Sequence, residues 1–87
     1  MKEKELIALN FNRKDVTSEE SGYQDDWHYY DMDFGEGGLT LISPSNDEVE
    51  NDEWYVDVLD DNTIRFTNIS DVKTFIDLIK RNTMDRF

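Results

Sequence analysis

Cysteine is absent from this chain of 87 residues, and proline and glycine are scarce, with one and four residues. Without cysteine the chain has no disulfides, no thiolate-held zinc and no cysteine nucleophile. No apolar run approaches the roughly 18 residues that a membrane-spanning helix needs. The first five residues include Glu3 and Glu5, whereas a signal peptide begins with basic residues. We therefore expect a cytoplasmic protein with no membrane segment.

Basic residues are also few, since nine Lys and Arg face 21 Asp and Glu and leave a net charge of -12. Residues 15–61 hold 16 of the carboxylates and no lysine or arginine. Solubility alone needs a net charge of only about 2 to 8 in a small domain. Because phosphate binding depends on Lys and Arg, this balance predicts no direct nucleic-acid binding.

Apolar residues are sufficient for one core. Hydrophobic residues make up 37% of the chain and aromatic residues 13%, which is too rich for a disordered acidic tail. The length suits one domain, so we expect residues 1–87 to form a single domain.

Alternation of apolar and polar residues predicts strands at residues 6–11, 27–34, 39–42, 53–59 and 63–67. The polar residues 12–26 are expected to form a loop, and the glycines within 35–38 suit a hairpin turn. Ser45 and Glu48 have the spacing of a capping box, which suggests one helical turn there. The side chains expected on the inner face of the sheet are Ile7, Leu9, Phe11, Tyr30, Met32, Phe34, Leu39, Leu41, Trp54, Val56, Val58, Ile64 and Phe66.

A helix is expected after residue 68. Asn68 or Ser70 can cap its start, and an apolar stripe follows with helical spacing, formed by Val72, Phe75, Ile76 and Ile79. Such a stripe must pack on an apolar sheet face. The sequence therefore predicts the α+β class, with an antiparallel sheet of four or five strands and one C-terminal helix packed on one face.

Catalytic chemistry has little support in the sequence. His28 is the only histidine and falls on the inner side of its strand beside Tyr30, which favours a core-edge residue with a hydrogen-bond partner. The chain has no serine elbow, phosphate loop or dinucleotide fingerprint. Residues 46–53 offer oxygens to Ca²⁺ but lack the EF-hand spacing and glycine, so weak, adventitious binding is the most we expect. We expect no enzymatic activity, no cofactor and no built metal site.

The outward side of the predicted sheet is the candidate partner-binding surface. It combines carboxylates that would repel one another with tyrosine and tryptophan, which often anchor protein interfaces. An alternative explanation needs no partner, because an exposed sheet face is polar in any protein and aromatic residues favour strands. The candidate residues are Trp27, Tyr29, Asp31, Asp33, Glu53, Tyr55 and Asp57.

Two functions fit these features. In the first, the protein occupies a basic, possibly nucleic-acid-binding, surface of a partner protein, as a nucleic-acid mimic or a phage or mobile-element inhibitor does. In the second, it is an accessory or immunity-type interaction module with one specific protein partner, and its acidity serves only solubility. A mimic competes with nucleic acid for many basic proteins, whereas a module recognises one. The sequence leaves the oligomeric state open.

The acidic block predicts that added salt stabilises the fold. Residues 15–61 repel one another, and mobile ions screen that repulsion. We expect the melting temperature to rise with NaCl concentration in thermal melts without sulfate. A melting temperature that stays flat or falls would mean that the fold already neutralises these carboxylates.

Overall fold

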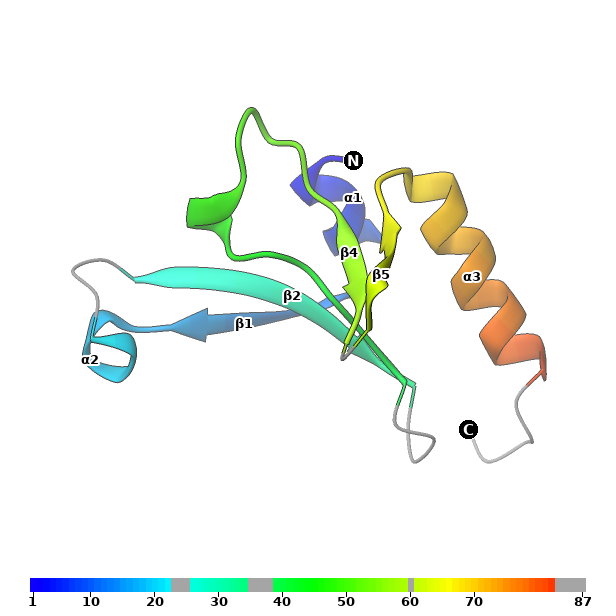
Figure 1. Cartoon of the computed structure of the whole chain (residues 1–87), viewed down its shortest axis with the longest axis horizontal. Helices are drawn as coiled ribbons and strands as arrows, with labels where there is room; N and C mark the ends of the chain where they lie inside the picture. Colours follow the sequence, from blue (N-terminus) through cyan, green and yellow to red (C-terminus); the bar gives the residue numbers. More distant parts are fainter. Residues whose placement is uncertain (23–25, 35–38, 60, 83–87) are drawn as a thin grey trace.

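The computed structural model describes residues 1–22, 26–34, 39–59 and 61–82, and forms one five-stranded antiparallel sheet with a C-terminal helix (Figure 1). The strands pair in chain order, so the sheet is a meander. This confirms the predicted α+β class. The elements are α1 (Glu3–Ala8), β1 (Asn12–Val16), α2 (Ser18–Ser21), β2 (Trp27–Asp33), β3 (Thr40–Ile42), the 3₁₀ turn η1 (Asn46–Glu48), β4 (Val56–Val58), β5 (Asp61–Phe66) and α3 (Ile69–Asn82).

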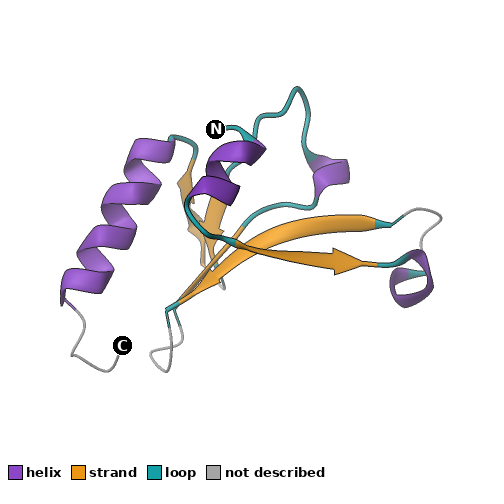
Figure 2. Ribbon diagram, turned by 180° about the vertical axis from the view of Figure 1, so that it is seen from behind, coloured by secondary structure: helices purple, strands orange, loops and turns teal. Residues whose placement is uncertain are grey.

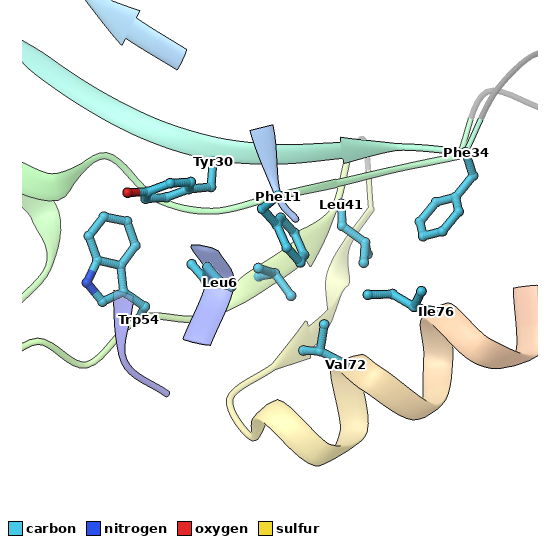
Figure 3. Close-up of a cluster of buried hydrophobic side chains, with 9 residues drawn as sticks. Leu6, Phe11, Tyr30, Phe34, Leu41, Trp54, Val72 and Ile76 are labelled. Carbon is cyan, nitrogen blue, oxygen red and sulfur yellow. The ribbon is translucent and has the colours of Figure 1, made fainter. Parts of the chain in front are cut away.

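One face of the sheet carries the core. Alternate strand residues point toward α1 and α3, which both place apolar side chains in the same cluster (Figure 3). The predicted hairpin residues behave as expected, because Phe34 and Leu41 are buried and Leu39 packs against them. The predicted turn at 35–38 lies outside the described residues. The buried core consists of Leu6, Phe11, Tyr30, Phe34, Leu41, Trp54, Val56, Val72 and Ile76.

Helix α3 follows its sequence pattern. Val72 and Ile76 are buried, and Phe75 and Ile79 pack against the core. The Asn68 side chain accepts a hydrogen bond from the Ser70 N–H at 2.8 Å, so Asn68 is the capping residue. The predicted stripe is therefore the face that covers the sheet.

The expected strand at residues 6–11 is wrong, because residues 3–8 form helix α1. Leu6 is fully buried, whereas Ile7, which was expected on the inner face, is 55% exposed. The helix is favoured by two acids in its first turn, where the helix dipole is positive. It ends before Asn10, whose positive φ of 68° turns the chain.

The loop expected at residues 12–26 is also wrong in part. Residues 12–16 form β1, which pairs antiparallel with β2, and residues 18–21 form the short helix α2. Strand β1 has almost no apolar residues because it is an edge strand and four of its five residues are exposed. Backbone pairing holds it, and charged residues such as Arg13 and Lys14 are typical of edges.

Strands β4 and β5 differ from expectation in extent and at one inward residue. Strand β4 has three residues, and its pairing with β5 shifts register at Asp57 and Val58. Ile64 was expected inward but is 41% exposed, because α3 covers the other end of edge strand β5, where the rings of Phe66 and Phe75 lie 5.1 Å apart. The inward placement of Trp54 and Val56 is confirmed.

The molecule is elongated. Its principal extents are 43 × 26 × 25 Å and its radius of gyration is 13.8 Å, compared with about 12 Å for a compact chain of this length. The β1–β2 ribbon accounts for this shape, because it continues past the core and carries α2 at its far end (Figures 1 and 2).

Two truncations should separate the core from the surface. Trp54→Ala should lower the free energy of unfolding by about 3–5 kcal/mol, since a buried aromatic ring leaves a cavity. Ile7→Ala should change it by less than about 0.5 kcal/mol, because the residue is exposed on a helix. Urea unfolding followed by circular dichroism measures both values. A large loss from Ile7→Ala would contradict the position of α1.

Candidate functional site

The face of the sheet opposite α1 and α3 is called the outer face here. Since directly opposed residues of an antiparallel pair share a face, the register defines it strand by strand. Asp31 is opposite Asn12 and Ile42, Ile42 is opposite Asp57, and Asp57 is opposite Arg65. The outer face comprises Asn12, Lys14, Val16, Trp27, Tyr29, Asp31, Asp33, Thr40, Ile42, Tyr55, Asp57 and Arg65.

The structure brings six of the seven candidate residues to this face. Four alternate along β2, namely Trp27, Tyr29, Asp31 and Asp33. Asp57 lies on β4, and Tyr55 comes just before that strand. Glu53 is different: it is exposed in the loop before β4, and its N–H donates to the Glu50 carbonyl at 3.0 Å. The expected strand 53–59 was too long, so Glu53 does not join the row.

The outer face is less acidic than expected, because two basic residues come from the edge strands. Lys14 of β1 lies opposite Tyr29. Arg65 of β5 makes two hydrogen bonds to the Asp57 carboxylate, from Nε at 2.8 Å and from a terminal nitrogen at 3.2 Å. The hydrogen bond to Asp57 raises the pKa of Arg65. The carboxylates of this face are therefore partly neutralised.

Aromatic rings line the outer face beside these charges. The guanidinium carbon of Arg65 lies 4.0 Å from the centre of the Tyr55 ring, a cation–π contact. The rings of Trp27 and Tyr29 lie 5.9 Å apart, tilted by 34°. The indole nitrogen of Trp27 is buried and has no hydrogen-bond acceptor among the described residues.

Exposed carboxylates collect at one end of the molecule. Helix α2 and turn η1 both lie at the end where β2 begins (Figure 1). The Asp26 carboxylate accepts the Ser18 N–H at 2.6 Å, and the Asn46 side chain accepts the His28 N–H at 2.8 Å, so both segments are fastened to the start of β2. The acidic end comprises Asp15, Glu19, Asp26, Asp47 and Glu48, all exposed.

The predicted helical turn at Ser45 is present but is not held by a capping box. The Ser45 hydroxyl donates to the Glu48 carboxylate at 2.9 Å and also to Asp47. The Glu48 N–H bonds the Ser45 carbonyl instead of its side chain. Two carboxylates are thus directed at one hydroxyl.

A second polar cluster lies on the inner face. The Tyr30 hydroxyl donates to Glu3 Oε2 at 2.7 Å, and His28 Nε2 lies 2.7 Å from the same oxygen. The His28 ring stacks on Trp54 with centroids 6.0 Å apart. The interpretation of His28 as a core-edge residue with a hydrogen-bond partner is confirmed. The partner, Glu3, was missed because it lies on a helix where the sequence predicted none.

This cluster of Glu3, His28, Tyr30 and Trp54 fastens α1 to β2. Burial and the Glu3 carboxylate raise the pKa of Tyr30 to about 12, so the hydroxyl stays protonated and donates. Burial would raise the pKa of Glu3, but the hydrogen bonds from Tyr30 and His28 outweigh it and the pKa is lowered. The polar groups of Glu3, His28 and Tyr30 are engaged in contacts with one another, which is typical of a structural cluster.

An open groove of about 430 Å³ lies where α3 approaches the turn after α1. Its apolar lining is Leu9, Met32, Phe34 and Ile79, and its polar lining is Asn10, Asn12, Asp33 and Lys80. Within the described ranges no group of three acidic or histidine side chains could hold a metal ion. None of the helices in that part of the chain is long and apolar enough to cross a membrane.

Comparisons with known proteins give no relative: no family model, no curated protein and no solved structure matches the chain.

The Glu3 contacts predict an acid-dependent stability. Because the pKa of Glu3 is lowered from 4.5 in the folded protein, its carboxylate stabilises the fold above that pH and stops doing so as pH falls through the folded-state pKa. Glu3→Gln should cost about 1 kcal/mol near neutral pH, the value for a partly exposed charged hydrogen bond. The cost should shrink in acid.

Urea unfolding at several pH values measures this difference. The matched control is Glu53→Gln, which makes the same charge change at an exposed position outside the cluster. A cost for Glu3→Gln that is equal at neutral and acid pH would contradict the assigned role of the carboxylate.

Proposed function

We propose that this protein is a small, acidic, non-enzymatic binding protein that occupies a basic surface of a partner protein, as a nucleic-acid mimic or a phage or mobile-element inhibitor does. The observation that carries the proposal is the separation of charge along the molecule. The acidic end lies at one extreme of the long axis, whereas α3 lies at the other and carries Lys73, Lys80 and Arg81 against only Asp71 and Asp77 (Figure 1).

The size of the net charge also supports a polyanion. Duplex DNA carries one charge per roughly 1.7 Å of axis, so a length of 43 Å carries about 25 charges. The net charge of -12 is about half of that number. Averaged over the whole molecule, the protein thus has the sign and about half of the charge of a duplex of equal length, with the carboxylates concentrated toward the acidic end.

The absence of enzymatic activity is part of the proposal. The only histidine is engaged with Glu3 and stacked on Trp54. The Tyr30 hydroxyl is directed at the same carboxylate and its residue is 1% exposed. Groups held in this way serve packing, which leaves the surface of the protein for its function. A cytoplasmic location belongs to the same proposal.

A second function is favoured by one specific observation. Asp57 is neutralised by Arg65, which also covers Tyr55. A surface whose charged and aromatic groups are held in fixed positions by such contacts suits an accessory or immunity-type module that recognises a single protein. The two functions differ in whether nucleic acid competes with the partner.

A competition pull-down separates the two functions. The intact protein is immobilised, a bacterial lysate is applied at moderate salt, and bound proteins are challenged with duplex DNA. A mimic should retain several nucleic-acid-binding proteins and lose them to the DNA. A module should retain one protein that DNA does not release. Retention of only non-basic proteins would contradict the mimic, and retention of several unrelated non-basic proteins would contradict the module as well.

A charge-matched variant tests the acidic character directly. Glu19→Gln combined with Glu48→Gln removes two exposed carboxylates of the acidic end and should mainly slow association, with a smaller dependence of affinity on salt. Surface plasmon resonance with a captured partner measures both. The control is Asp71→Asn with Asp77→Asn on α3, the same charge change at exposed sites away from the acidic end.

A further inference from the structure

The outer face contains an arginine-binding arrangement that the chain fills with its own residue. Tyr55 and Asp57 are two residues apart and point to the same side. Arg65 lies with its guanidinium carbon 4.0 Å from the Tyr55 ring centre and forms two hydrogen bonds to Asp57. The ring binds the face of the guanidinium group, and the carboxylate binds its edge.

The same pair of residue types recurs on β2. Tyr29 and Asp31 have the spacing of Tyr55 and Asp57 and also project from the outer face. The two aspartates lie in one cross-strand row, because both are opposite Ile42. With strands about 4.8 Å apart, the two pairs are about 10 Å apart.

The Tyr29–Asp31 pair differs from the Tyr55–Asp57 pair in the residues of the neighbouring strand that lie opposite it. Asp57 is opposite an arginine, whereas Asp31 is opposite Asn12, and Tyr29 is opposite Lys14. Asparagine carries no charge, and the exposed lysine lies on an edge strand. Trp27 adds a second ring beside Tyr29, with centroids 5.9 Å apart. The described part of the chain therefore places no guanidinium group on this pair.

We propose that Tyr29 and Asp31 bind an arginine side chain of the partner protein in the geometry that Arg65 shows within the chain. This inference rests on the proposed function, which requires a basic partner, and names the residue that the partner must supply. Lysine does not replace arginine at such a site, because an ammonium group cannot stack and bond a carboxylate at two points.

Two synthetic peptides of equal length, poly-arginine and poly-lysine, serve as probes for the intact protein. Both carry the same charge, so general attraction to the acidic end is equal. We expect poly-arginine to bind about tenfold more tightly, the size of one stacked and bidentate contact. Fluorescence anisotropy of labelled peptides at moderate salt measures the ratio.

Variants at the site should remove the preference without removing all binding. Tyr29→Leu and Asp31→Asn should bring the two peptides to similar affinity, whereas Tyr29→Phe should keep the preference because it keeps the ring. Glu50→Gln, a loop control, should weaken both peptides equally. Lys14→Gln should strengthen poly-arginine binding about twofold, since a neighbouring positive charge is removed. Thermal melts confirm that each variant is folded.

A spectroscopic readout reports the contact itself. In isotope-labelled poly-arginine, protons beside the guanidinium group should shift upfield when they lie over the Tyr29 ring, and Tyr29→Leu should abolish that shift. The corresponding protons of Arg65 give the reference, and Tyr55→Leu should change these alone. Equal affinity for the two peptides would overturn the inference and leave the proposed function standing. Failure of both peptides to bind would overturn both.

Discussion

The hydrogen bond from the Tyr30 hydroxyl to the Glu3 carboxylate is the contact on which the position of α1 against the sheet depends. It joins the N-terminal helix to the centre of the longest strand. His28, two residues earlier on the same strand, contacts the same Glu3 oxygen through Nε2. The chain before α1 is fixed as well, because Trp54 N–H donates to the Met1 carbonyl at 2.7 Å. With α1 and α3 held on one side, the opposite side of the sheet stays open to a partner.

Sequence patterns predicted the parts of the fold in which one side of an element is buried. Helix α3 was recognisable because Val72 and Ile76 belong to a stripe with helical spacing, and β2 because Tyr30 and Phe34 alternate with polar residues. Strand β1 was not recognisable, since an edge strand with exposed side chains is held by backbone hydrogen bonds that leave no apolar pattern. Helix α1 is short and has a single fully buried residue, Leu6, too little for a periodic signal.

The candidate surface was predictable along a strand but not across strands. Alternation alone places Tyr29 and Asp31 together on one side of β2. The two basic residues of the outer face, Lys14 and Arg65, depend on which strands pair and in which register. The charge map of the sequence treats residues 15–61 as a block without basic residues, yet pairing brings an arginine from outside the block onto Asp57. The opposite charges of Asp57 and Arg65 on two consecutive predicted strands were the available signal.

The two tryptophans lie on opposite faces of the same sheet. Trp54 is 4% exposed within the inner layer, whereas Trp27 belongs to the open side next to Tyr29. Indole emission responds to the polarity and mobility of its surroundings, so each ring is an optical probe of a different process. Two single-tryptophan variants, Trp27→Phe and Trp54→Phe, separate these processes. The first keeps Trp54, whose emission reports loosening of the interior, and the second keeps Trp27, whose emission reports contact at the surface. The fold thus contains its own paired reporters of stability and of association.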